Sequence, residues 1–255
     1  MDFNVIIPAR LGSTRLAEKV LLDIAGKPMI QHVHERAKES GAAHVVIATD
    51  DEKIAQIAED FGAHVCMTAA THQSGTERIA EAVANLGFED DDIIISLQAD
   101  EPLMPPKLIS QLAANLAEHD HVKAATLATK LKDPKDLFNP NIVKVILNHR
   151  NYAITFSRAP IPWDRNQFAA LKNLNEVDQL KLADGYLRHI GLYAYRASFL
   201  ETYANLPACL NETLESLEQL RILWNGYKMH VGITDVPIIA GVDTPADLER
   251  VRAHV

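Results

Sequence analysis

Cysteine is scarce in this chain, with only Cys66 and Cys209 among 255 residues. The two lie far apart and show no paired spacing, so we expect each to be a buried thiol rather than half of a disulfide. The 11 histidines are scattered along the chain. None forms a His-x-x-x-His pair or a Cys-His cluster, which argues against a zinc site.

Long apolar runs are also missing, and positive charge is the minority. No segment approaches the length that spans a membrane, and residues 4–10 are too short and reach a charged residue too soon to be a signal peptide. We therefore expect a cytoplasmic protein with no membrane insertion. The 25 Lys and Arg against 34 Asp and Glu give a net charge of −9. That balance argues against general nucleic-acid binding.

Strand and helix patterns alternate over the first half of the chain. Short apolar runs predict buried strands at residues 3–9, 44–50, 64–68 and 92–102. Amphipathic segments with Pro or Gly at their ends predict helices at residues 28–40, 51–62, 74–87 and 105–119. This alternation predicts an α/β fold with a doubly wound, mostly parallel sheet that binds ligands at the carboxyl ends of its strands.

The rhythm changes in the second half. Residues 123–131 and 141–158 are typical of antiparallel strands, with a hairpin turn at 148–151. The remaining predicted elements are a strand and a helix in 187–204, one helix over 211–226 closed by Gly226, a strand at 228–236 and a capped helix at 243–255. With no repeat or linker, we predict a single domain, 1–255, with an inserted antiparallel lobe at about 122–195.

The loop after the first strand, within VIIPARLGSTRLAEK (5–19), carries three cations, Arg10, Arg15 and Lys19. It lacks the Gly-Lys-Ser/Thr ending of a P-loop and the spaced glycines of a dinucleotide site. A solvated loop would explain any one of these cations. Three of them at the end of a buried strand favour a triphosphate, because charge-assisted bonds to phosphate oxygens are strong.

Two acidic motifs are candidates for a metal site. Asp100 and Glu101 end the apolar strand at 92–102, where carboxylates could hold Mg²⁺ against phosphates. A helix start that favours acids explains them equally well. Asp243 and Thr244 precede Pro245, as at a helix N-cap. Asp243 becomes a metal candidate only if the fold brings it beside Asp100.

The motif THQSGTERIAE (71–81) has two interpretations. Ser74 and the glycine and threonine after it place backbone amides at a helix start, with Arg78 one turn later. Such a helix start can bind a base or a phosphate. A simple capping arrangement is nearly as good an explanation.

Taken together, four motifs resemble one family: IIPARxxSTRLxxK, HQSGTER, LQxDEP and GVDTPxDLE. They are similar to the motifs of the 3-deoxy-manno-octulosonate cytidylyltransferases, the CMP-Kdo synthetases. The resemblance continues through FNPNIVKV, FSRAPIPWDR, LRHIGLYAYRA and LEQLRILWNG, so it covers nearly the whole chain in order. It implies a GT-A-like nucleotidyltransferase fold and a homodimer. It also implies that CTP reacts with 3-deoxy-D-manno-octulosonate (Kdo), with Mg²⁺, to give CMP-Kdo and pyrophosphate for lipopolysaccharide synthesis.

The resemblance also implies roles for residues that match the family motifs. The positions implied to meet the nucleotide or the metal are Arg10, Arg15 and Lys19 at the CTP phosphates, Ser74 and Arg78 near cytosine and ribose, Gln98 near the nucleotide or sugar, and Asp100 and Asp243 on Mg²⁺. The positions implied to contact the sugar acid are Arg158, His189, Tyr193 and Glu218. From the residues alone, a structural histidine explains His189 better, and a solvated helix face is an open alternative for Glu218. The PWDR segment resembles a dimer contact.

The chain departs from the family pattern at Ala17 and Glu18, where Pro-Gly is usual, and at Ala99, where Gly is usual. Glu18 places a negative charge beside the expected triphosphate. The departures leave two alternatives open: a cytidylyltransferase for a variant sugar acid, 8-amino-Kdo or a sialic acid, and a non-catalytic nucleotide-binding protein.

Overall fold

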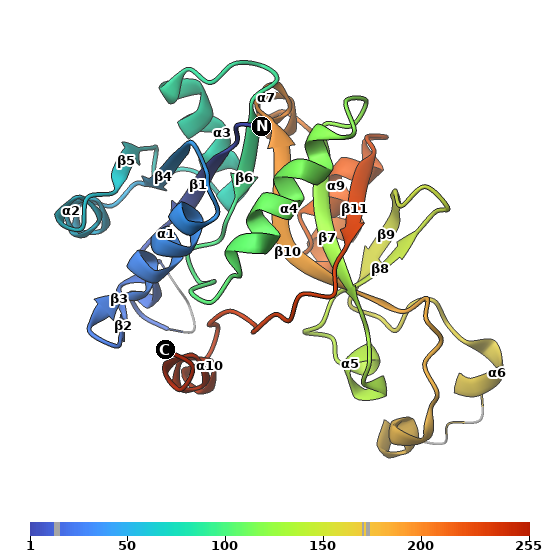
Figure 1. Cartoon of the computed structure of the whole chain (residues 1–255). Helices are drawn as coiled ribbons and strands as arrows, with labels where there is room; N and C mark the ends of the chain where they lie inside the picture. Colours follow the sequence, from blue (N-terminus) through green and yellow to red (C-terminus); the bar gives the residue numbers. More distant parts are fainter. Residues whose placement is uncertain (13–15, 170, 172–173) are drawn as a thin grey trace. The chain divides into compact units, whose positions relative to one another are not determined.

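The computed structural model describes residues 1–12, 16–169, 171 and 174–255 (Figure 1). Internal contacts divide the chain into two compact units. The first unit contains residues 1–120, 192–205 and 236–255, and the second contains 121–191 and 206–235. The chain therefore leaves the first unit and returns to it twice. The predicted division, one domain over 1–255 with a lobe at about 122–195, stays a prediction.

The first unit is built on the predicted parallel strands. Its strands are β1 (Asn4–Ala9), β4 (His44–Thr49), β5 (His64–Met67), β6 (Ile93–Ser96) and the last part of β10 (Leu187–Arg196). Strand β1 pairs in parallel with both β4 and β6, and β4 pairs in parallel with β5. Residues 193–196 of β10 pair antiparallel with β6. All six residues of β1 are buried, as an apolar strand covered on both faces requires. The mostly parallel α/β fold is confirmed.

Helices cover this sheet. They are α1 (Met29–Glu39), α2 (Glu52–Asp60), α3 (Gly75–Leu86), α4 (Pro106–Ala117) and α7 (Ala197–Ala204). Helix α1 packs along β1 and β4, and α3 packs between β1 and α7 (Figure 1). A turn of 3-10 helix, η1 (Lys19–Leu21), and two short strands, β2 (Asp23–Ile24) and β3 (Lys27–Pro28), lead into α1.

The C-terminal helix, α10 (Pro245–Arg252), packs against the start of the chain. Ile24 and Met29 share an apolar cluster with Val242 and two residues of α10. The guanidinium of Arg252 donates to the carbonyl of Asp23 at 3.1 and 2.7 Å. These contacts hold the C-terminal segment of the first unit against residues 23–29. As a result, the residues just before α10 lie close to the loop that follows β1.

The second unit holds β7 (Ala124–Lys130), β8 (Lys144–Leu147), β9 (Ala153–Ser157), β11 (Met229–Ile233) and residues 187–191 of β10. Strands β8 and β9 form the predicted antiparallel hairpin, and Asn151 in its turn has φ of 59°. Strand β7, which was expected to be antiparallel, lies between β10 and β11 in the sheet and pairs in parallel with β11. The first five residues of β7 are all buried, which is typical of a strand covered on both faces.

The remaining helices of the second unit are short. They are α5 (Pro134–Phe138), α6 (Arg165–Phe168), the 3-10 helix η2 (Leu174–Gln179), α8 (Leu210–Glu215) and α9 (Gln219–Trp224). The single helix predicted over 211–226 is wrong, because Ser216 takes a left-handed conformation with φ of 51° and separates α8 from α9. Gly226, with φ of 83°, closes α9 as predicted.

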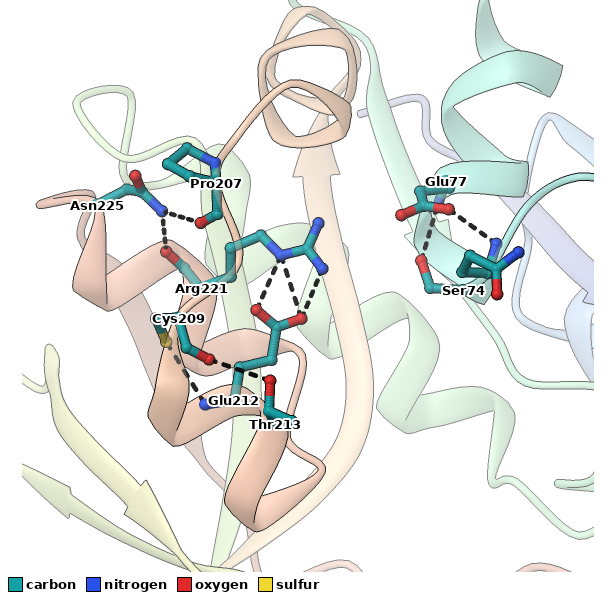
Figure 2. A network of polar contacts seen from close by, with 9 residues as sticks. Ser74, Glu77, Pro207, Cys209, Glu212, Thr213, Arg221 and Asn225 are labelled. Carbon is teal, nitrogen blue, oxygen red and sulfur yellow. Dashed lines mark hydrogen bonds and ion pairs between the residues drawn. The ribbon is translucent and has the colours of Figure 1, made fainter.

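A partly buried ion pair crosses this break. The guanidinium of Arg221 on α9 binds both carboxylate oxygens of Glu212 on α8, with distances of 2.6 to 3.1 Å (Figure 2). Cys209 caps α8 through its sulfur, which accepts from the amide of Glu212. Cys66 and Cys209 are both buried and no disulfide joins them, as predicted. Within the described part of the chain, no helix is long and apolar enough to cross a membrane.

Candidate active site

The carboxyl ends of β1, β4 and β6 meet at one edge of the first unit's sheet, because the three strands are parallel. Arg10 follows β1 directly and is exposed, Asp50 follows β4, and Gln98 and Asp100 follow β6. Arg15, the second cation expected there, lies outside the described residues. The candidate site is therefore built at the edge that the alternating pattern indicated.

Lys19, Asp100 and Asp243 come together at this edge. The Lys19 Nζ atom lies 2.6 Å from Oδ2 of Asp100 and 3.2 Å from Oδ1 of Asp243. Burial lowers the pKa of Lys19, but the charges and hydrogen bonds of Asp100 and Asp243 outweigh it and raise this pKa above its ordinary value. The fold therefore brings Asp243 close to Asp100, which was the condition for regarding Asp243 as a metal candidate.

The segment before α10 fixes Asp243 in place. Thr244 caps the helix in a capping box with Asp247, so capping uses Thr244 while the Asp243 side chain meets Lys19. Burial alone would raise the pKa of Asp247, but hydrogen bonds from Thr244, Arg250 and two backbone amides lower it to about 2. Asp247 therefore stays ionised and holds the amides of both Asp243 and Thr244.

Gly241 sets how closely this segment approaches Asp100. The amide of Val242 donates to the carbonyl of Asp100 at 2.9 Å. A Cβ added at Gly241 would lie 2.6 Å from that same carbonyl oxygen and 2.7 Å from Oε1 of Glu101. No side chain fits in that space without displacing backbone, so the close contact depends on glycine.

The two carboxylates fit a divalent cation. One ammonium touches an oxygen of both Asp100 and Asp243, so one metal ion could do the same. Mg²⁺ is commonly held by one or two carboxylates together with water and substrate phosphates. Among the described residues, no cluster of three or more His, Cys, Asp or Glu gathers to hold an ion by itself. The donor set suits a metal that a phosphate helps to bind.

Ser74 and Arg78 are engaged in holding α3. The Ser74 hydroxyl accepts from the amide of Glu77, and the Glu77 carboxylate accepts from the amide of Gln73 (Figure 2). The capping interpretation of this motif is confirmed for Ser74. Arg78 is 4% exposed; its guanidinium lies 3.0 Å from Asp50 and 2.5 Å from the hydroxyl of Thr68. Arg78 therefore joins α3 to the strand ends that carry the site.

Gln98 lies against the start of α3. A Cβ at Gly75 would be 3.5 Å from Oε1 of Gln98, and the Gln98 amide donates to Ser96 at 3.3 Å. Tyr193 is opposite Ser96 in the β10–β6 pair and stacks on Tyr195. Ala99 is buried at 5% exposure, so its methyl group packs inside the protein.

Glu18 directs its carboxylate toward α2. Its backbone is left-handed, with φ of 50°, and Oε2 lies 2.6 Å from the ammonium of Lys53. The charge that was unexplained in the sequence is thus paired with a cation 35 residues later. No sequence pattern connects the two residues, so this partner was missed.

Arg158, the proposed contact of the sugar carboxylate, belongs to the second unit and is held firmly. Its amide donates to Oε2 of Glu215 at 2.6 Å, and its guanidinium donates to the carbonyls of Glu215 and Pro140 at 2.6 and 2.9 Å. Its own carbonyl accepts from the ammonium of Lys144 at 2.6 Å.

Lys144 and Glu215 were missed by sequence reasoning. Lys144 is fully buried, and its ammonium also donates to the carbonyls of Asn139 and Ile142. Burial lowers the pKa of Lys144 to about 8, against an opposing effect of Glu215. A lysine inside the apolar run NIVKVIL was the signal that could have found it.

His189 is buried in the second unit. One ring nitrogen lies 3.0 Å from the hydroxyl of Thr126, and the ring packs edge-on against Phe156. Burial, with a smaller effect of Arg188, lowers the pKa of His189 to about 3, so the imidazole is neutral at pH 7. This environment suits a structural or hydrogen-bonding histidine rather than a cation. Glu218 is exposed at the start of α9.

Comparisons with known proteins agree with this geometry. A family model described as cytidylyltransferase matches residues 4–230. A 3-deoxy-manno-octulosonate cytidylyltransferase of Coxiella burnetii (strain RSA 493 / Nine Mile phase I) is 58% identical over 254 residues, covering 100% of both chains. The enzyme of the same name from Pasteurella multocida (strain Pm70) is 56% identical over 99% of this chain and 98% of its own.

A solved structure also matches over the full length. It is CMP:2-keto-3-deoxy-manno-octonic acid synthetase complexed with CTP, which aligns with a TM-score of 0.87 and 41% identity over 100% of this chain and 98% of its own. A cytidylyltransferase from Leptospira borgpetersenii, at 18% identity and a TM-score of 0.62 over 99% of this chain and 86% of its own, shares the fold.

Proposed function

Because this chain belongs to the family of 3-deoxy-manno-octulosonate cytidylyltransferases, we propose that it transfers CMP from CTP to the anomeric hydroxyl of Kdo, releasing pyrophosphate. Two findings support the proposal. Enzymes of that name are 56% and 58% identical to this chain over nearly its full length, and a solved relative is complexed with CTP. Within the molecule, the main support is the contact of the Lys19 ammonium with both Asp100 and Asp243.

The reaction needs charge control at the triphosphate. The sugar hydroxyl attacks the α-phosphorus while pyrophosphate leaves in line, so negative charge grows on the leaving oxygens. Arg10 and Lys19, at the sheet edge, are the described cations that would bind these phosphates. Asp100 and Asp243 would hold Mg²⁺, which would neutralise phosphate charge and help to align the nucleophile.

The sugar acid needs a cation for its carboxylate. We propose Arg158 for this role, with His189, Tyr193 and Glu218 as further contacts, on the basis of the family motifs. Because His189 is neutral at pH 7 by its environment, it would contribute a hydrogen bond rather than a charge. The hydrogen bonds that hold Arg158 fix its position, which is what recognition of a planar carboxylate requires.

Four further properties are part of the proposal: Mg²⁺ as cofactor, a homodimer, a cytoplasmic location and a place in lipopolysaccharide synthesis. The family resemblance supports each of them. Sedimentation of the purified chain tests the dimer, and a monomer at micromolar concentration would refute it.

The experiment is pyrophosphate release from purified protein with CTP, Kdo and Mg²⁺. We expect release that is lost on chelation and falls by at least about 100-fold in Asp100→Ala, since one carboxylate then remains for the metal. Asp60→Ala, at the exposed end of α2, is the matched control and should retain full rate. CTP-dependent thermal stabilisation without release from Kdo or from other 2-keto-3-deoxy sugar acids would overturn the transferase proposal.

A further inference from the structure

Lys19 takes up the place that a metal ion would need. Its ammonium lies 2.6 Å from an oxygen of Asp100 and 3.2 Å from an oxygen of Asp243. The Lys19 side chain is 13% exposed, whereas those of Asp100 and Asp243 are 32% and 53% exposed, so solvent reaches the carboxylates more than the ammonium. The same two oxygens are the described donors that fit a divalent cation at this edge of the sheet.

Two cations cannot share this place. An ammonium and a divalent ion within about 4 Å of each other repel by several kcal/mol at the effective dielectric near a protein surface. Lys19 carries a positive charge at pH 7, as lysine ordinarily does. Relief of the repulsion therefore requires the ammonium to move.

We propose that Lys19 and the divalent cation compete for Asp100 and Asp243, so that metal binds well only when the triphosphate gives the ammonium another anionic partner. This inference rests on the proposed function and adds a binding order to it. Metal and nucleotide become positively coupled, and by linkage each raises the affinity of the other.

The chain around Lys19 allows the movement. The lysine side chain has four flexible methylenes and a compact charge. Lys19 opens the three-residue turn η1, directly after Glu18, whose backbone is left-handed. A change of side-chain rotamer is enough to move the ammonium from the carboxylates toward a bound anion.

The test measures Mn²⁺ binding to the purified full chain without nucleotide, by electron paramagnetic resonance of the free ion. We expect Lys19→Met to bind Mn²⁺ at least about tenfold more tightly than the wild type, because the competing charge is gone. Lys27→Met, which removes a lysine paired with Glu35 on the surface, is the matched control and should bind like the wild type. Equal or weaker binding by Lys19→Met would overturn the inference.

Two further arms identify the site and guard against a folding defect. Adding Asp243→Asn to Lys19→Met should abolish the gain in Mn²⁺ affinity, and a gain that persists would place the metal elsewhere and refute the inference. In the wild type, Mn²⁺ alone should raise the melting temperature by less than about 1 °C, since a weakly bound ion shifts stability little. Strong stabilisation by Mn²⁺ alone would contradict the competition whatever the variants do.

The proposed function can fail separately. The Mn²⁺ measurements use neither Kdo nor catalysis. If Lys19→Met binds Mn²⁺ more tightly but the wild type releases no pyrophosphate with Kdo, the competition stands and the proposal of Kdo as acceptor is refuted. If the wild type releases pyrophosphate normally but Lys19→Met binds Mn²⁺ no more tightly, the proposed function stands and the competition is refuted.

Discussion

The ammonium of Lys53 on α2 lies 2.6 Å from the carboxylate of Glu18 in the loop after β1. Both side chains are about half exposed, at 52% and 50%, so the pair adds at most about 1 kcal/mol to folding. Its main effect is on the local field, because it offsets a negative charge next to the residue that binds Asp100 and Asp243. A carboxylate in this loop is therefore compatible with a triphosphate site.

Removal of Lys53 should weaken nucleotide binding. We expect Lys53→Met to raise the KM for CTP by about two- to fivefold at low ionic strength, and by less at high salt, because screening acts on exposed charges. Steady-state pyrophosphate release at two salt concentrations measures this. The double variant Glu18→Gln/Lys53→Met is the control and should return to the wild-type KM. If the double variant behaves like Lys53→Met, the ion pair is not the cause.

A methyl group at Gly241 should separate the two carboxylates that are proposed to hold the metal. Its Cβ would lie 2.6 Å from the Asp100 carbonyl, and such overpacking costs about 1 to 3 kcal/mol. We expect Gly241→Ala to lower kcat/KM by about 100-fold through misplacement of Asp243. Gly185→Ala is the control, since its added Cβ meets no heavy atom of the described residues within 4 Å. An unchanged rate in Gly241→Ala would show that Asp243 is not needed at that position.

His189 should make stability fall in mild acid. The folded protein holds the pKa of His189 at about 3, whereas an unfolded histidine has a pKa of about 6.5. Below pH 6.5 the unfolded state therefore takes up a proton that the folded state refuses. Stability due to this group is complete above pH 6.5 and declines toward pH 3, by up to about 1.4 kcal/mol per pH unit.

Urea unfolding at pH 7, 6 and 5 measures this slope. His189→Gln should flatten it by most of that amount, even if its stability at pH 7 is lower. His64→Gln, at an exposed strand position, should retain the wild-type slope. Parallel slopes for the wild type and His189→Gln would mean that His189 is not the group responsible.

Glu215 should act through Arg158. Its two carboxylate oxygens accept from the Ser157 hydroxyl and the Arg158 amide, both at 2.6 Å. In Glu215→Gln one of these donors faces an amide NH₂ group, which costs about 1 to 3 kcal/mol. We expect the KM for Kdo to rise several-fold while the KM for CTP stays the same. Glu118→Gln, at an exposed position after α4, is the control, and an equal rise in both KM values would indicate general damage instead.

The fold could be predicted where local pattern and tertiary packing agree. All six residues of β1 are buried, and every one of them except Asn4 is apolar, so the pattern predicted this strand. The prediction of one helix over 211–226 was wrong. The amphipathic pattern is continuous there, whereas the folded chain turns at Ser216 and forms two helices. The parallel pairing of β7 with β11 was not predicted for a related reason, since it depends on a strand about 100 residues later and leaves no mark on the residues of β7 themselves.

The site could be predicted only in part, because its contacts are distant in sequence. The motifs identified Lys19, Asp100 and Asp243 separately. Only the fold shows that one ammonium joins them, or that Thr244 caps α10 while Asp243 faces the lysine. Lys53 and Glu215 act on other residues of the site and carry no motif of their own, so nothing in the order of residues singles them out.

The contact between Lys19 and Asp243 closes 224 residues of chain. Contacts of such separation are slow to form, because the entropy of closing the loop is lost before they contribute. We therefore expect the carboxylates proposed to hold the metal to meet late in folding. A fluorescent or metal probe at this place would report when the molecule is finished, while the strands around β1 would report only that folding has begun.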